Sequence, residues 1–350
     1  MLGHNRSAPG TTRLGRFLLA EDTTIRALMS RTLARRLAWI LESRVRCRIE
    51  PVRLRVRHGA YSKELARLRD RMRWQAVPLD RLFGGADDDF WYWLIRESYV
   101  RRRDFEGVLP GFPDDSVQVR FTGSSGELML WQAFSAYRLF RMLAADHGRP
   151  LQSCRLVLDF GCGWGRIIRF FLKDVIADRL WGIDASAEAI EICRRNDRWS
   201  RFEVVAPSGP TPFSDGAFDL IYSFSVFSHF SEEMQFRWLE EIRRILQPGG
   251  LFIATTRPRD FIEQSVLDRI RQPVSRHPEA IAGVFGDTRR WLTAYDEGRY
   301  CYEPLPGVVG WGETCIPKAY VLRHWTKYFT ILDYIDDPRR CAQDVIVAQR

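Results

Sequence analysis

From residue 155 onward, short apolar runs alternate with longer amphipathic segments. The short runs are rich in β-branched and aromatic residues and predict strands at Leu156–Phe160, Arg179–Ile183, Arg201–Val205, Phe218–Phe224 and Leu251–Thr255. The longer segments predict helices at about Arg166–Val175, Ala187–Asn196 and Glu232–Leu246. Strands that alternate with helices predict a parallel, doubly wound α/β sheet.

The end of the chain departs from this alternation. Two further strands are expected at Tyr328–Ile335 and Asp344–Ala348, with Pro338 but no helix between them. Strands joined so closely pair antiparallel. The fold class that follows is α/β, a Rossmann-like, doubly wound seven-stranded sheet with a terminal antiparallel strand pair.

The first 115 residues have a different pattern, which predicts a basic, mainly helical N-terminal extension. Apolar residues at helical spacing with arginines between them predict an amphipathic helix at 25–45, and residues 61–74 predict another. Residues 51–58 alternate apolar and Arg, which predicts a short strand. We therefore expect two parts, an extension over 1–115 and a larger domain over 116–350.

Charge is concentrated in that extension. Residues 1–75 carry 18 Lys or Arg and 6 Asp or Glu, a balance of +12, whereas the other 275 residues carry −3 of the total +9. The basic segment 21–47 fits peripheral contact with an anionic membrane surface or with nucleic acid. The alternative, which such a pattern more often represents, is a helix packed on its own domain or on a partner subunit, and the sequence leaves the oligomeric state open.

Cysteine usage and hydropathy bear on location. The seven cysteines form no CxxC pair, and their number is odd, so we expect neither a disulfide framework nor a metal site. This usage favours a reducing, cytoplasmic location. No apolar run reaches the roughly 18 residues of a membrane-spanning helix. The first 20 residues lack acids and contain three Arg, so organelle targeting is an alternative.

The stretch VLDFGCGWGR, residues 157–166, carries the sharpest chemical signal. A predicted buried strand leads into Gly161, Gly163 and Gly165, and a predicted helix follows. Glycines are needed where the backbone turns sharply against a ligand. The next strand is followed by Asp184, where a carboxylate can accept hydrogen bonds from both ribose hydroxyls.

These features alone fit NAD or S-adenosylmethionine (SAM). NAD requires a wider GxGxxG turn, whose helix N-terminus faces the pyrophosphate, whereas the spacing here is GxGxG. SAM carries an ammonium group instead of a phosphate, which suits a carboxylate beside the loop, Asp159.

From about residue 121 onward, the chain resembles the class I SAM-dependent methyltransferases. Four segments in the family's order carry the resemblance: VLDFGCGWGR, WGIDAS, PFSDGAFDLIYSFSVFSHF and LEEIRRILQPGG followed by LFIATT. The resemblance implies SAM as cofactor. It places Gly161, Cys162, Gly163 and Gly165 along the methionine portion, Asp184 on the ribose, and Ala185 and Phe213 toward the adenine.

Two further features accompany the resemblance. Many members have an acidic residue just after the third strand, but here that segment reads Pro207-Ser208-Gly209, so adenine recognition would rest on backbone groups. The upstream segment VRFTGSSGELML also resembles an element that precedes the first motif. It would bring Phe121 or Gly123 near the cofactor.

His229 follows the fourth predicted strand and is the candidate catalytic base, since an imidazole titrates near neutral pH. The alternative is that it only braces the next helix. Residues 257–316 are expected to form an acceptor-site insertion. Its aromatic residues either stack on an acceptor ring or fill a lid core; they are Trp291, Tyr295, Tyr300, Tyr302 and Trp311.

The function predicted from these features is SAM-dependent methyl transfer to a hydroxyl of a small molecule or saccharide. The signatures of enzymes that methylate base amines or cytosine C5 are absent at the fourth strand, which reads Tyr222-Ser223-Phe224-Ser225. Two alternatives remain: an RNA-directed methyltransferase that uses the basic arm, and a non-catalytic partner subunit with this fold.

Overall fold

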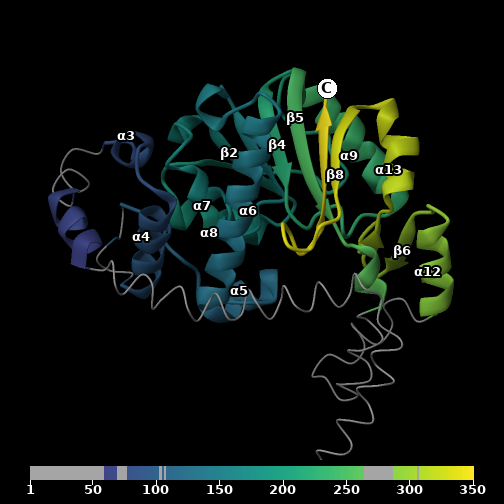
Figure 1. Ribbon diagram of the computed structural model, residues 1–350, viewed down its shortest axis with the longest axis horizontal. Helices are drawn as coiled ribbons and strands as arrows, with labels where there is room; N and C mark the ends of the chain where they lie inside the picture. Colours follow the sequence, from purple (N-terminus) through teal and green to yellow (C-terminus); the bar gives the residue numbers. More distant parts are fainter. Residues whose placement is uncertain (1–58, 69–76, 102–104, 106–107, 264–286, 306) are drawn as a thin grey trace, which may run out of the picture.

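The computed structural model describes residues 59–68, 77–101, 105, 108–263, 287–305 and 307–350 (Figure 1). The basic helix predicted at 25–45 and the strand predicted at 51–58 lie outside the described residues. Of the helix predicted at 61–74, residues 59–68 are described and are helical.

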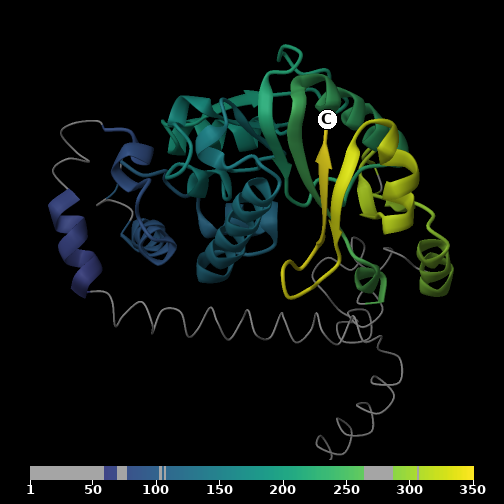
Figure 2. The same ribbon diagram turned by 45° about the horizontal axis from the view of Figure 1, so that its top comes forward.

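A seven-stranded sheet forms the centre of the described part, with strand order β3-β2-β1-β4-β5-β9-β8. β1 to β5 are parallel, whereas β9 runs antiparallel to both β5 and β8. Figures 1 and 2 show the last two strands, in yellow, side by side. The predicted fold class is therefore confirmed. The bounds are β1 Val157–Phe160, β2 Leu180–Asp184, β3 Arg201–Val204, β4 Phe218–Ser223, β5 Leu246–Thr256, β8 Thr330–Ile335 and β9 Asp344–Gln349.

Both faces of the sheet are covered, because alternate residues of its strands pack in two different hydrophobic clusters. In β5, Ile253 packs on one face and Phe252 on the other; in β9, Val347 and Ile346 divide in the same way. Alternate side chains of a strand point to opposite faces. Continuous apolar runs in these strands therefore signal a sheet between two helical layers.

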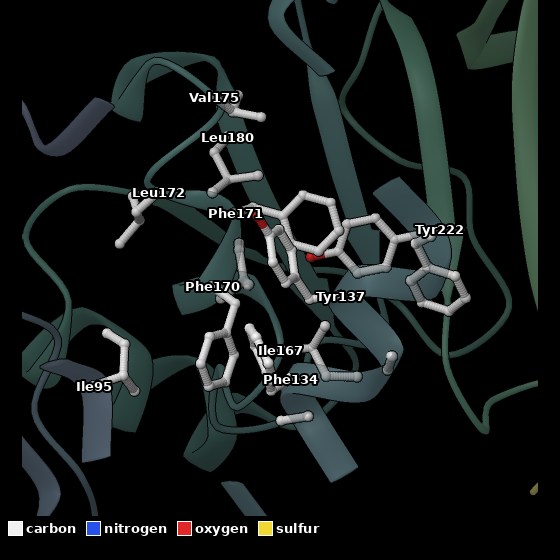
Figure 3. Packing of buried hydrophobic residues seen from close by; sticks show 14 of the residues in the cluster. Ile95, Phe134, Tyr137, Ile167, Phe170, Phe171, Leu172, Val175, Leu180 and Tyr222 are labelled. Carbon is white, nitrogen blue, oxygen red and sulfur yellow. The ribbon is translucent and has the colours of Figure 1, made fainter. Parts of the chain in front are cut away.

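One layer contains α6 (Gly126–Asp146), α7 (Ile168–Phe171) and α8 (Ala187–Asn196). Aromatic and aliphatic side chains share its core (Figure 3). Phe171 stacks on Tyr222 of β4, with ring centroids 4.5 Å apart and planes 8° from parallel, and Tyr137 of α6 meets Phe171 edge-on at 5.2 Å. Such ring contacts stabilise the layer beyond the area that they bury.

Residues upstream of 116 enter this same core. α3 (Leu79–Phe83) and α4 (Asp88–Val100) bury Phe83, Trp91 and Ile95 with the residues of α6 and α7. The Trp91 indole donates to the carbonyl of Phe170 at 3.0 Å. The described residues 79–100 are thus packed on the sheet domain, while the predicted boundary at 115/116 stays a prediction.

A network of charges ties α4 to this layer. Asp88 accepts from Arg141 at 2.8 and 2.6 Å and from Lys173 at 3.0 Å. The Lys173 side chain is 4% exposed, and Tyr137 bonds Asp174 beside it. Although burial acts to raise it, the pKa of Asp88 is lowered by the hydrogen bonds from Arg141 and Lys173.

The other layer contains α9 (Glu232–Ile245) and α13 (Lys318–His324). Ser231 caps α9 by accepting from the Met234 amide at 3.2 Å, as its sequence position indicates. Within the described ranges, no helix combines the length and the apolar character that crossing a membrane requires.

The insertion after β5 contributes α12 (Thr288–Asp296) and a hairpin of β6 (Cys301–Pro304) and β7 (Gly312–Cys315). It lies at the same end of the molecule as α13, opposite α3 and α4 (Figure 1).

Three segments differ from the sequence-based elements. The helix expected at 166–175 is a four-residue helix, α7, set among turns, because the chain bends repeatedly to bury almost every side chain there. The polar, glycine-rich stretch before α6 contains a helix, α5 (Asp115–Thr122), ended by Gly123 at φ 72°. β5 begins at Leu246, five residues earlier than predicted, where Leu246 pairs with Phe218.

Candidate functional site

The glycine loop follows β1 at the carboxyl edge of the sheet, where ligands of this fold bind. The amides of Gly161 and Cys162 donate to the carbonyl of Ile183 in β2 at 2.8 and 3.0 Å. Gly161 has φ 76°, and a Cβ added to it would lie 2.2 Å from Cγ2 of Val226. A side chain is therefore excluded at Gly161 by both conformation and space.

Gly163 is in a different situation. Its φ is 52°, and a Cβ added there would meet no atom within 4 Å. The loop backbone thus borders open space at this point. Gly165, in contrast, faces the protein: its Cβ would lie 3.3 Å from the Cys193 sulfur. Cys162 is buried, and its thiol sulfur lies 3.5 Å from the Gly163 carbonyl.

Asp184, the last residue of β2, holds the loop from the side. One carboxylate oxygen accepts from the Gly163 amide at 2.9 Å and the other from the Ser186 amide at 2.8 Å. Burial raises the pKa of Asp184, and these backbone hydrogen bonds act against the rise. Each oxygen keeps a further lone pair for another donor. Ala185, the next residue, is exposed.

Asp159 lies in β1, two residues before Gly161, and is 2% exposed. Its Oδ2 has no hydrogen-bond partner among the described residues. Burial raises the pKa of Asp159 to about 8, with Tyr222 acting to lower it and Asp184 to raise it. A buried carboxylate oxygen without a donor is unfavourable, so this position suits a cationic or hydrogen-donating ligand group.

Phe213 is not brought to this edge. Its ring meets Trp181 at 5.2 Å and Phe218 at 4.8 Å, both edge-on. Trp181 and Phe218 lie toward the amino ends of β2 and β4, opposite the ends that carry Asp184 and the loop. The expectation that Phe213 lies toward the adenine is thus corrected, because its ring packs near the amino ends of β2 and β4.

His229 lies beyond the carboxyl end of β4, half-buried. Its Nδ1 is 2.8 Å from the Gly312 carbonyl oxygen, and its ring stacks on Trp311 with centroids 4.9 Å apart and planes 11° from parallel. A carbonyl only accepts hydrogen bonds, so Nδ1 carries the hydrogen and Nε2 keeps a lone pair. Burial, with help from Arg257, lowers the pKa of His229 to about 4.

Two charged residues beside His229 were missed by the sequence interpretation. Glu313 of β7 lies 3.8 Å from Nδ1 of His229 and pairs with Arg257 at 2.5 Å. Arg257 directly follows β5, and its cation lies 3.9 Å from the Phe261 ring centroid. No local signal links these residues, because β7 reaches the site by long-range pairing: Trp311, directly before β7, bridges to Phe230, and Cys315 bridges to Arg257.

The aromatic residues of the insertion mainly contact protein. Tyr300 donates to the Phe230 carbonyl at 2.9 Å and packs on Tyr320, and Trp311 covers His229. Trp291 and Tyr295 pack on a small cluster around Ile262. Their role in stacking on an acceptor stays a prediction.

The turn after β4 also carries backbone strain. Ser225 has φ 62°, which non-glycine residues rarely adopt. Its amide donates to Thr255 at 2.7 Å, and its hydroxyl accepts from Gln343 at 2.8 Å. This turn places Val226 against Gly161 and leads the chain on to His229. The sequence gives no indication of it, since strain at a serine requires these distant partners.

Comparison with known proteins agrees with this geometry. A family model described as "Methyltransferase domain" matches residues 157–250, from β1 into β5. A fatty-acid O-methyltransferase of Mycolicibacterium smegmatis is 27% identical over 172 residues, which cover 43% of this chain and 62% of that protein. A probable tRNA methyltransferase 9B of Bos taurus is 34% identical over 156 residues, covering 43% of this chain and 32% of that protein.

Among solved structures, magnesium protoporphyrin IX methyltransferase from Synechocystis PCC 6803, with bound SAH, is similar at 14% identity. The match covers 67% of this chain and 93% of that one, with a TM-score of 0.42. This chain spans less than two thirds of either curated relative named above.

The fold and the glycine loop define a class of protein that binds a nucleoside cofactor at the carboxyl edge of a Rossmann-like sheet. Residues 157–250 match a family model described as "Methyltransferase domain", and the cofactor that such a domain implies is SAM. The residues present fit that cofactor: the partnerless oxygen of Asp159 suits an ammonium, and Gly163 borders open space. Asp184 offers carboxylate lone pairs at the end of β2.

Proposed function

We propose that this protein transfers the methyl group of SAM to a hydroxyl of a small molecule or saccharide, with His229 as the general base. SAM supplies an activated methyl group, so the protein has mainly to align the acceptor oxygen with it. A hydroxyl must also lose its proton, and a positioned base supports that step.

The observation that carries the proposal is the contact between Nδ1 of His229 and the Gly312 carbonyl. It fixes the tautomer in which Nε2 is the free acceptor. The lowered pKa keeps the ring neutral at physiological pH, so the base form is always present, although its basicity is reduced. When Nε2 takes the acceptor's proton, the carboxylate of Glu313, 3.8 Å from Nδ1, lies where it stabilises the new positive charge.

Cofactor binding is assigned to the loop and its neighbours. Gly161, Cys162, Gly163 and Gly165 shape the backbone beside the methionine portion, Asp159 faces its ammonium, and Asp184 receives the ribose hydroxyls. Ala185, the exposed residue that follows Asp184, lies toward the adenine in this arrangement. The open space beside Gly163 supports this arrangement, since a side chain there would occupy it.

The test has two arms. The protein is incubated with methyl-labelled SAM and fractionated host extract, and labelled products are identified by mass spectrometry; hydroxylated small molecules and saccharides are the expected class. With the product known, His229→Ala is expected to lower kcat by about 10²- to 10⁴-fold with SAM affinity unchanged.

His147→Ala is the matched control, because His147 follows α6 at the opposite edge of the sheet. Turnover of His229→Ala equal to wild type would refute the base assignment. The name of the Mycolicibacterium smegmatis relative gives fatty acids as its acceptor. If label appeared only on carboxylates, the hydroxyl acceptor would be refuted. The base would then have no role, because a carboxylate is already deprotonated.

A second candidate is methylation of RNA. The chain resembles a probable tRNA methyltransferase over 156 residues, and residues 1–75 carry a charge balance of +12. Full-length protein would then bind RNA with an affinity that falls steeply with salt, and label would appear in the RNA fraction. Absence of label there excludes this candidate.

A further inference from the structure

Gln343 ends the loop that joins β8 to β9 and directly precedes Asp344, the first residue of β9. Antiparallel pairing of β9 with β5 sets Asp344 beside Thr256, at the carboxyl end of β5. The loop is far in sequence from the turn after β4, but this pairing brings its last residue to that turn. Gln343 therefore lies at the same edge of the sheet as His229.

The Gln343 side chain closes a ring of hydrogen bonds around Ser225. The Ser225 amide donates to the Thr255 hydroxyl at 2.7 Å, and that hydroxyl donates to Oε1 of Gln343 at 2.6 Å. Nε2 of Gln343 donates in turn to the Ser225 hydroxyl at 2.8 Å, which lies 3.1 Å from the hydroxyl of Ser228. Thr255 and Ser228 are buried, and hydrogen bonds are stronger in such surroundings than in water.

Ser225 needs this support, because its φ of 62° is unfavourable for a residue with a Cβ. Such a conformation persists only where surrounding contacts hold it. Thr255 belongs to β5 and is fixed by the sheet, whereas Gln343 comes from a loop. Loss of the Gln343 side chain removes both hydrogen bonds that it forms in the ring, so Ser225 would relax away from the left-handed conformation.

The strained turn leads directly into the segment that carries His229. The His229 amide donates to the Val226 carbonyl at 2.9 Å, inside the turn. On the other side, the His229 carbonyl accepts from the Gly312 amide at 2.7 Å, and Nδ1 lies 2.8 Å from the Gly312 carbonyl oxygen. His229 is thus held between the turn and β7. A shift of the turn would move His229 relative to Gly312 and weaken the contact that fixes its tautomer.

We propose that Gln343 is a positioning residue: by holding Ser225 in its left-handed conformation, it keeps the His229 ring in the tautomer in which Nε2 is the proton acceptor. Gln343 acts through the turn and not on the reacting atoms. The inference rests on the proposed role of His229 as the base, but its first test requires no methyl acceptor.

That test is nitrogen NMR of isotope-labelled histidine side chains, which reports the tautomer of each ring. The signal of His229 is assigned by its loss in His229→Ala. In wild type, Nδ1 is expected to carry the hydrogen; in Gln343→Leu, the signal is expected to show exchange between the two tautomers. Melting temperatures establish that the variant is folded. An unchanged His229 tautomer in folded Gln343→Leu would overturn the proposal.

Turnover with methyl-labelled SAM, on the acceptor that gains label, gives the second readout. Gln343→Leu is expected to lower kcat by about 10- to 100-fold, because a small misplacement of a catalytic group has an effect of this size. Calorimetric affinity for S-adenosylhomocysteine should fall much less. Adding Ser225→Gly should restore turnover, because glycine adopts a positive φ without the support of the ring. An equal loss of kcat on Gln343→Leu with and without Ser225→Gly would overturn the proposal.

Gln349→Leu is the matched control, since Gln349 lies at the other end of β9, where it donates to the Gly249 carbonyl at 3.3 Å. It should change neither the His229 tautomer nor kcat, and a change as large as that in Gln343→Leu would overturn the proposal. Wild-type turnover in His229→Ala would instead refute the proposed function, and the NMR comparison would still decide the role of Gln343.

Discussion

Gly161 and Val226 touch across the gap between the cofactor loop and the turn after β4: a Cβ on Gly161 would lie 2.2 Å from Cγ2 of Val226. The contact joins the segment assigned to the cofactor with the segment that carries His229. The left-handed Ser225 precedes Val226 and directs it there. The proposed cofactor and acceptor sides of the site are thus in contact through these two residues.

This contact predicts opposite behaviour of two loop glycines. Gly161→Ala should lower the free energy of unfolding by about 1–3 kcal/mol through overpacking, with added backbone strain. Gly163→Ala meets no atom within 4 Å, so it should affect stability less but weaken SAM binding. Denaturant melts and calorimetry measure both. Equal destabilisation by the two changes would contradict the packing argument.

Asp184→Ala is expected to weaken SAM binding about 10- to 100-fold, because it removes both the proposed ribose acceptor and the anchor of the Gly163 amide. Asp184→Asn keeps one acceptor oxygen and should lose less. Glu191→Gln, in an exposed pair with Arg195 on α8, is the control and should bind as wild type. Calorimetric affinity unchanged in Asp184→Ala would remove the ribose assignment.

The pH dependence of turnover follows from the surroundings of His229. Because its pKa is lowered to about 4, the neutral base persists well below pH 6.5, and kcat/KM should decline only as pH approaches 4. Arg257→Met removes a cation that depresses this pKa, so the acidic limb should move to higher pH. An acidic limb of wild type near 6.5 would be inconsistent with a buried His229 as the base.

The raised pKa of Asp159 predicts that the stability of the fold falls as the pH rises. Its folded pKa of about 8 lies above the unfolded value near 3.8, so its contribution is complete below pH 3.8 and is lost as pH rises through 8. Asp159→Asn cannot ionise and should therefore melt at a higher temperature than wild type at pH 8–9, while binding SAM more weakly. A melting temperature below that of wild type at this pH would argue against a buried carboxyl group whose pKa is raised.

The Asp88 network tests whether α4 is integral to the domain. Asp88→Ala leaves the buried Lys173 and half-buried Arg141 without their shared partner, so unfolding should become easier by about 3 kcal/mol. Glu64→Gln, in an exposed pair with Arg67, should change stability little. Urea titrations measure the free energy of unfolding of both variants and of the wild type. A neutral Asp88→Ala would mean that α4 is only loosely attached.

The sequence alone determined the sheet and the cofactor loop, because both are local patterns. Apolar runs with turns between them located the strands of the sheet, and the glycine spacing with Asp159 and Asp184 located the loop. These features depend on neighbours within a few residues or on one conserved fold rule, that parallel strands meet at a common edge. Ser231, directly before α9, is a local capping signal of the same kind.

Only the tertiary structure decided which groups meet at the site. Glu313 and Arg257 reach His229 because β7 pairs beside the segments after β4 and β5, and Phe213 is drawn to the opposite edge by Trp181 and Phe218. The pKa of His229 and the lack of a hydrogen-bond partner for Oδ2 of Asp159 likewise arise from burial among residues far apart in sequence. Burial and long-range pairing are properties of the packed chain, and no local pattern encodes them.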